Sequence, residues 1–215
     1  MGEHGIRVED LRLLGGRPCI DFVNTVENRA GTSPVDVITD ATALVAWARH
    51  AGILDAADGE RLLRHADEPD SGAQRTLVQA LRLREALHRV LLAVARQHDP
   101  PAADLRMIER VYQRALAHAH LTPAGARLAW DWRSAEPRLE HVLWMIAMSA
   151  VELLTNGDLK RVKVCDNQHG CGWLFYDGSK NASRRWCSME GCGSQVKMRR
   201  QYAKRRAQSD RREAT

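Results

Sequence analysis

Helical periodicity dominates the first three quarters of the chain. Apolar side chains recur every three or four positions between Ala73 and Gln97, and this run stops before Pro100 and Pro101. The same spacing predicts a helix that begins at Asp36 or Thr39 and ends at Gly52, and further helices over residues 56–65, 103–118 and 134–157. Residues 19–25 fit either a short helix or a strand, and residues 128–132 alternate as a short strand does. We therefore expect a mainly α fold, with a helical N-terminal domain at residues 1–158 that contains a few short strands.

The pattern changes after residue 158, where four of the five cysteines lie. Cys165 and Cys171 form one close pair, and Cys187 and Cys192 form a second, with glycines beside Cys171 and Cys192. Two such pairs joined by a hairpin-length loop can place four thiolates around one ion, as tetrahedral structural zinc requires. His169 is the competing ligand, but its use would leave a cysteine idle. The alternative of disulfides is disfavoured, because the N-terminus lacks a secretory signal.

We therefore predict one structural Zn²⁺, held by Cys165, Cys171, Cys187 and Cys192, in a small finger at residues 159–215. Such a finger is too small to fold on its own core and depends on the metal. Loss of zinc is expected to unfold the finger while the helical domain survives.

Charge is distributed unevenly along the chain. The net charge of +5 combines 14 Lys and Arg against 5 acids in residues 160–215 with 18 against 22 in residues 1–159. A helix is predicted from Val196 to Arg212, and it is strongly basic. We expect contact with nucleic acid from Arg184, Arg185, Lys197, Arg199, Arg200, Lys204, Arg205 and Arg206. A polybasic membrane patch and a strut against the acidic domain are the two alternatives.

Several other classes of protein are disfavoured. No apolar run is long enough for a membrane span, which favours a cytoplasmic protein without a membrane partner. Neither a Gly-rich phosphate loop nor a convincing carboxylate pair occurs, so we predict that the chain is not an enzyme. Asn24, Thr25 and Arg84 are polar residues in apolar surroundings, and a pocket lined by them would suit an anionic or amide-bearing effector. Alternatively, capping explains the first two, and Arg84 reaches solvent or pairs with a carboxylate such as Asp21.

Two stretches of sequence carry a family resemblance. The strings CGWLF at 171–175, DGSKN at 177–181, SRRWCSM at 183–189 and CG at 192–193 resemble the CGNR-type zinc finger. The chain departs from the name-giving Cys-Gly-Asn-Arg string at Ser194 and Gln195. The string GGRPCIDFVNTV at 15–26 resembles the opening of the domain that usually precedes this finger, a stress-induced transcription regulator domain (ABATE-like).

The resemblance implies a zinc-dependent transcriptional regulator that binds duplex DNA, associated with the nucleoid and responsive to stress or to a ligand. A homodimer through the helical domain would be needed to read two half-sites. Two rival functions fit the same residues: a zinc-stapled protein-interaction module, and an RNA-binding protein.

Overall fold

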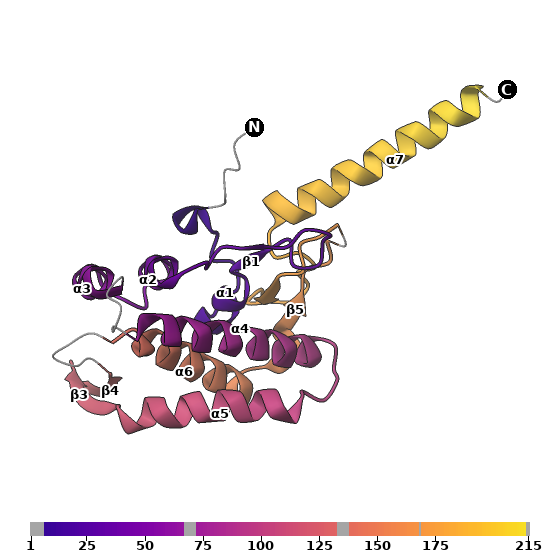
Figure 1. Ribbon diagram of the computed structural model, residues 1–215. Helices are drawn as coiled ribbons and strands as arrows, with labels where there is room; N and C mark the ends of the chain where they lie inside the picture. The colour runs from indigo at the N-terminus through magenta and orange to yellow at the C-terminus, as the bar shows by residue number, and fades with distance from the viewer. Residues whose placement is uncertain (1–6, 67–71, 133–137, 168, 214–215) are drawn as a thin grey trace.

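Three long helices form the centre of the computed structural model, which describes residues 7–66, 72–132, 138–167 and 169–213. These helices are α4 (Ala73–Ala95), α5 (Ala102–Ala117) and α6 (Glu140–Asn156), and they pack side by side (Figure 1). Helix α4 follows Gly72, which has a φ of 71° that residues with a β-carbon rarely adopt. The helix ends at Ala95, before the stop predicted at Pro100. The predicted start of α6 near Ser134 lies outside the described residues.

Shorter helices cover this centre. They are a 3₁₀ turn (Val8–Asp10), α1 (Pro18–Val23), α2 (Ala41–His50) and α3 (Ala56–Ala66). The ambiguous run at 19–25 is helical as far as Val23. Pro18 occupies the first helical turn, where its fixed φ suits a helix, and the helix buries Ile20 and Phe22. Phe22 packs on Trp47 of α2 with ring centroids 4.9 Å apart.

Of the two starts predicted for α2, Asp36 is wrong, and Thr39 lies two residues before the observed first residue, Ala41. The Asp40 carboxylate accepts a hydrogen bond from the Ala43 amide at 2.7 Å and so caps α2 at its observed start. The preceding residues pair instead as two short antiparallel strands, β1 (Val26–Glu27) and β2 (Val35–Asp36).

A second hairpin joins α5 to the region before α6. The predicted strand at 128–132 is confirmed as β4 (Arg127–Asp131), and its antiparallel partner is β3 (His120–Ala124). Sequence reasoning missed β3 because Pro123 indicated a break, but a two-stranded hairpin has free edges that tolerate a proline.

The finger shares its core with the helical domain. Its strands are β5 (Val162–Val164), which follows a 3₁₀ turn (Leu159–Arg161), and β6 (Leu174–Tyr176). Trp173, Leu174 and Phe175 are buried in the same cluster of side chains as Leu87 of α4 and Ile146 of α6. The described part of the helical domain and the metal-binding part of the finger therefore pack as one body.

The last helix is arranged differently. A π-helical turn (Met189–Gly193) leads into α7 (Ser194–Glu213), and α7 extends away from the rest of the molecule (Figure 1, yellow). The prediction of a mainly α protein ending in a basic helix is confirmed. Among the described residues, no helix combines the length and apolar character that crossing a bilayer requires.

Candidate metal centre and the basic helix

The four predicted cysteines converge on one point. Cys165 follows β5, Cys171 precedes β6, Cys187 lies in the next loop, and Cys192 lies in the π-helical turn. Their sulfur atoms all lie within 4.8 Å of one another. Cys187 Sγ is 3.7 Å from Cys171 Sγ and 3.6 Å from Cys192 Sγ. A tetrahedron with Zn–S bonds of about 2.3 Å has sulfur–sulfur edges of about 3.8 Å, so the four donors fit one zinc ion and leave no ligand position open.

Glycines give the chain the curvature that this convergence needs. Gly170 and Gly172, on either side of Cys171, have φ values of 120° and 65°. A β-carbon on Gly172 would also lie 2.7 Å from the Ala30 amide nitrogen. Gly193, beside Cys192, has no positive φ, and the nearest atom to a β-carbon there would be Met189 Sδ at 2.7 Å, on a flexible side chain that can move. The requirement for glycine is therefore strongest around Cys171.

The close thiols also favour a cation. Hydrogen bonds from Cys171 and Cys187 lower the pKa of Cys165, while the same contact with Cys165 raises the pKa of each of those two partners. Several thiolates cannot form side by side without a compensating charge, which a divalent cation would supply. Cys187 donates its amide hydrogen to Cys165 Sγ at 3.5 Å, a contact that would also orient this ligand.

A buried ion pair holds the loop between the cysteine pairs. The Asp177 side chain is fully buried and accepts hydrogen bonds from Lys163 Nζ at 2.7 Å and from the Arg184 amide at 2.8 Å. Its other oxygen accepts from Ser179. Burial alone would raise the pKa of Asp177, but the hydrogen bonds from Lys163 and Ser179 outweigh it and hold the pKa below its usual range. Sequence reasoning named Asp177 only within the DGSKN string and did not single out Lys163.

Asn24 joins the N-terminal segment to the finger. Its side-chain amide donates to the Leu174 carbonyl at 2.8 Å, and its side-chain oxygen accepts from the Leu174 amide at 3.0 Å. Close by, Trp173 Nε1 donates to the Val26 carbonyl at 3.2 Å. Asn24 thus pairs with β6 as a neighbouring strand would.

Arg84 has a carboxylate partner, but not the predicted one. Its guanidinium forms a bidentate pair with Asp36, with an Nη1–Oδ1 distance of 2.7 Å, and also donates to Thr25 Oγ1 at 3.0 Å. Asp21 accepts instead from the Gly15 amide at 2.7 Å. The polar groups of Asn24, Thr25 and Arg84 thus all have protein partners, and an effector site at these three residues stays a prediction.

Arg184 and Arg185 are engaged within the finger. Arg184 donates to the Cys187 carbonyl at 2.7 Å, and its guanidinium lies over the Phe175 ring. Arg185 pairs with Asp166 through Nε at 2.9 Å. Of the eight predicted nucleic-acid-binding residues, these two have structural partners.

The other six predicted cations lie on α7 and are exposed: Lys197, Arg199, Arg200, Lys204, Arg205 and Arg206. No carboxylate in the described part of the chain pairs with any of them. Lys197, Arg200 and Lys204 share one face, and Arg199 and Arg206 share the opposite one. Met198 and Tyr202, 56% and 72% exposed, lie on a third face.

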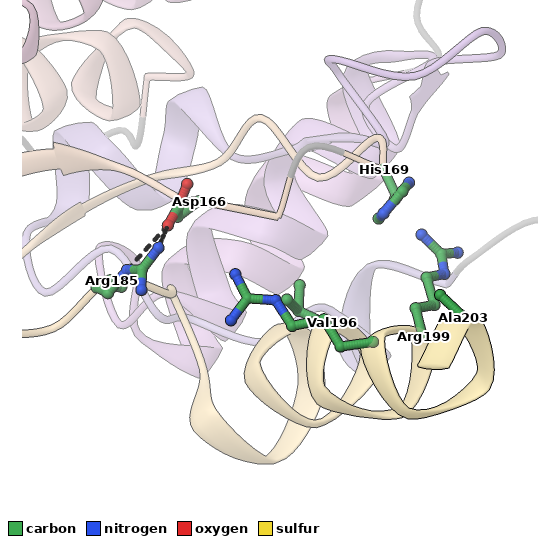
Figure 2. Close-up of a pocket in the computed structure, with 7 residues that line it drawn as sticks. Asp166, His169, Arg185, Val196, Arg199 and Ala203 are labelled. Carbon is green, nitrogen blue, oxygen red and sulfur yellow. Dashed lines mark hydrogen bonds and ion pairs between the residues drawn. The ribbon is translucent and has the colours of Figure 1, made fainter. Parts of the chain in front are cut away.

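A groove of about 400 Å³ separates the first turns of α7 from the finger. Val196 and Ala203 line it on the helix, and Arg199 and His169 extend into it from its two sides, while Asp166 is occupied by Arg185 (Figure 2). An anionic group in this groove would meet the guanidinium groups of Arg199 and Arg200 with no free carboxylate opposite them.

The two residues that depart from the family string have local roles. The Ser194 hydroxyl donates to the Met189 carbonyl at 3.1 Å. The Gln195 side-chain oxygen accepts from Asn167 at 3.1 Å, a bond that an arginine could not accept.

Comparisons with known families match both parts of the chain. Residues 16–157 match the family described as putative stress-induced transcription regulator (ABATE). Residues 161–205 match the CGNR zinc finger. These matches confirm both predicted resemblances and describe a zinc-binding regulator. A comparison with curated proteins finds no match.

Proposed function

The chain belongs to the putative stress-induced transcription regulator family, and we propose that it regulates transcription by binding duplex DNA through α7. The zinc centre has no catalytic role in this proposal, because four cysteines fill the coordination of the ion. Its role is to fix the start of α7 on the shared core.

The observation that carries this proposal is the set of exposed cations on α7. Six lysines and arginines fall within residues 197–206, and the described residues offer them no carboxylate partner. A solvated surface helix normally mixes the two signs of charge, since like charges three or four residues apart destabilise it. Phosphates of a nucleic acid would remove this repulsion and release counterions as they bind.

The shape of α7 favours a duplex over other polyanions. The helix protrudes from the body with cations on opposite faces, so it can enter a major groove and contact phosphates of both strands (Figure 1). Met198 and Tyr202 lie between these faces, where they would meet sugars or base edges. A-form RNA has a major groove too narrow and deep for such a helix.

The experiment compares three nucleic acids of matched sequence. Full-length, zinc-loaded protein is titrated against a DNA duplex, the matching single strand and the matching RNA duplex, with fluorescence anisotropy as the signal. We expect the DNA duplex to bind most tightly and all binding to weaken steeply with salt. Preference for RNA would support the RNA-binding alternative, and absence of binding to all three would support a protein-interaction module.

Sequence specificity is a separate step of the test. Genome-wide mapping of the bound protein should find discrete sites if α7 reads bases. Uniform binding across the genome would mean that the helix contacts phosphates alone.

A further inference from the structure

The β3–β4 hairpin exposes an apolar face. Its register places Leu121 opposite Trp130 and Pro123 opposite Leu128. Side chains alternate along a strand, so these four residues lie on one face of the hairpin. All four are exposed, with Leu121 57%, Leu128 66% and Trp130 52% exposed. Chance exposure of single apolar residues is common, but a whole hairpin face is not.

At its base, the same face of the hairpin packs against helices. Trp132 follows Leu128 and Trp130 at two-residue spacing, so it lies on the same face. It is buried against Ala115 of α5 and Trp144 of α6. Its indole nitrogen donates to the Ala115 carbonyl at 2.8 Å. The hairpin thus packs on α5 and α6 at its base and extends beyond them at its tip, where the apolar face has no cover among the described residues.

The same chain carries a surface of matching chemistry. A groove of about 380 Å³ runs between α5 and α6, and most of its lining is apolar: Leu105, Ile108, Tyr112, Leu116, Val151 and Leu154. Leu116, 41% exposed, lies four residues before the first residue of β3. A projecting apolar hairpin and an apolar groove therefore lie next to each other along the chain.

We propose that two copies of this chain form a two-fold dimer in which the hairpin of each copy docks in the α5–α6 groove of the other. A two-fold axis repeats every contact, so each hairpin-to-groove contact occurs twice in the dimer. One hairpin face offers only a few hundred Å², whereas a stable interface buries about 800 Å² per partner. A reciprocal contact uses a hairpin and a groove from each copy, which brings the area close to that value.

The proposed interface does not involve the metal centre or the cations of α7. Figure 1 shows β3 and β4 at one end of the molecule and α7 at the other. The dimer would therefore present two basic helices on the outside. Failure of the dimer would leave DNA binding by α7 untouched, and failure of DNA binding would leave the dimer untouched.

The test measures the oligomeric state of the full-length, zinc-loaded protein by sedimentation velocity at micromolar concentrations. We expect a dimer for the wild type. Leu128→Lys places a charge on the apolar hairpin face and should give monomers, with a dimer dissociation constant weakened at least about 100-fold because the change occurs twice. Ala129→Lys is the matched control, since position 129 is also exposed but lies on the opposite face of β4, and it should remain dimeric.

A mixing experiment distinguishes hairpin-in-groove docking from hairpin-on-hairpin docking. Leu116→Glu disables the groove and should also give monomers. A mixture of Leu128→Lys and Leu116→Glu chains retains one intact hairpin-in-groove contact. In the second contact the introduced lysine meets the introduced glutamate, so the mixture should form a one-to-one heterodimer. Far-UV circular dichroism and zinc content should match the wild type in each variant.

Three results would overturn the proposal. The first is a wild type that stays monomeric, which would mean that another partner covers the hairpin. The second is equal behaviour of Leu128→Lys and Ala129→Lys. The third is a mixture that stays monomeric, which would exclude the reciprocal contact.

Discussion

The metal-binding segment and helix α7 are adjacent in sequence but differ in environment. Trp173, Leu174 and Phe175 are at most 5% exposed and pack among the helices of the N-terminal domain. On α7, Met198 and Tyr202 are 56% and 72% exposed, and the cations around them have no acidic partners in the described part of the protein. The finger is therefore part of the core, whereas the cations of α7 remain available to a polyanionic partner.

This difference gives each region its own measurable property. Changes in the shared core should alter the free energy of unfolding and leave the salt dependence of DNA binding intact. Changes on α7 should do the reverse, because its side chains bury little surface. The predictions below apply this distinction, from the largest expected effect to the smallest.

Cys187→Ser should have the largest effect. Cys187 is 3% exposed and lies in the shared core, so loss of the metal should destabilise the helical domain together with the finger. Structural zinc contributes on the order of 10 kcal/mol to small domains, and we expect a loss of at least about 4 kcal/mol here. Urea unfolding followed by circular dichroism, with zinc measured in parallel, checks this.

The matched control is Cys19→Ala, which removes the fifth cysteine and should keep one zinc per chain. The sequence alone suggested that the helical domain would survive loss of zinc. If the circular dichroism transition of Cys187→Ser matches that of the wild type, the two parts fold separately. The shared core would then contribute nothing to the free energy of unfolding of the helical domain.

Asp177→Asn comes next. The substituted amide would direct one N–H toward Lys163 Nζ and the Arg184 amide, which are both donors, and it would leave the lysine without its counter-ion. Breaking a buried ion pair in this way costs about 3 kcal/mol or more. Glu190→Gln is the control, because Glu190 is 90% exposed and makes only a 3.7 Å contact with Arg12. Equal stability of the two variants in thermal unfolding would show that Asp177 does not hold the loop.

The pH dependence of the same residue has a definite sign. The pKa of Asp177 is lower in the folded protein than in the unfolded chain, so its contribution is complete above about pH 4 and is lost as pH falls further. Asp177→Asn should lack this loss at acidic pH.

Asp21→Asn should stabilise the protein. Burial raises the pKa of Asp21 to about 6, and the hydrogen bond from the Gly15 amide offsets this only in part. A raised carboxyl pKa means that the folded state binds the proton more tightly, so stability falls as pH rises from about 4 to about 6. Asparagine keeps an acceptor for Gly15 without the charge, and it should add about 2 to 3 kcal/mol at pH 7.

The difference between wild type and Asp21→Asn isolates this effect. His88 titrates in the same range with the opposite sign, because burial and then Arg29 lower its pKa to about 4, but it is present in both proteins. Denaturant titrations at a series of pH values provide the curves. A constant difference from pH 4 to pH 7 would mean that Asp21 has no raised pKa.

Gln195→Arg should have the smallest effect, and it changes DNA binding by α7 and not the free energy of unfolding. The change restores the arginine of the family string at the cost of the Asn167 hydrogen bond. One added phosphate contact would raise DNA affinity about fivefold at physiological salt and steepen the salt slope by about 0.9. Gln195→Leu is the control, since it removes the hydrogen bond without adding charge. If both variants bind DNA alike, position 195 does not face a phosphate.

The helices and the metal ligands could both be predicted from the sequence, because each depends on a local pattern. The period of apolar residues in α4 and the spacing of Cys165, Cys171, Cys187 and Cys192 are local patterns that remain visible without a fold. The start of α2 was left open between Asp36 and Thr39, and Asp36 belongs instead to β2. The strand β3 was missed, since Pro123 resembles a break.

Contacts distant in sequence could not be predicted in the same way. Asn24 hydrogen-bonds to Leu174 across 150 positions. Arg84 pairs with Asp36 and not with Asp21, since the pairing of β1 and β2 places Asp36 beside α4. The shared core follows from such contacts, so nothing in the composition of the finger indicated it. The sequence also grouped Arg184 and Arg185 with the cations of α7, although local partners engage both of them.

The most direct test of the central claim is the salt dependence of duplex binding. If α7 neutralises about five phosphates, the logarithm of the association constant should fall with the logarithm of salt concentration at a slope of roughly −4 to −5. Changing Lys197, Arg200 and Lys204 together to alanine should reduce the slope to about −2, with unfolding unchanged. The same change at Arg75, Arg82 and Arg106, three exposed arginines of the helical domain, removes equal charge and should leave the slope as it was. A slope that is shallow in the wild type, or that responds equally to both triple variants, would contradict DNA binding by α7.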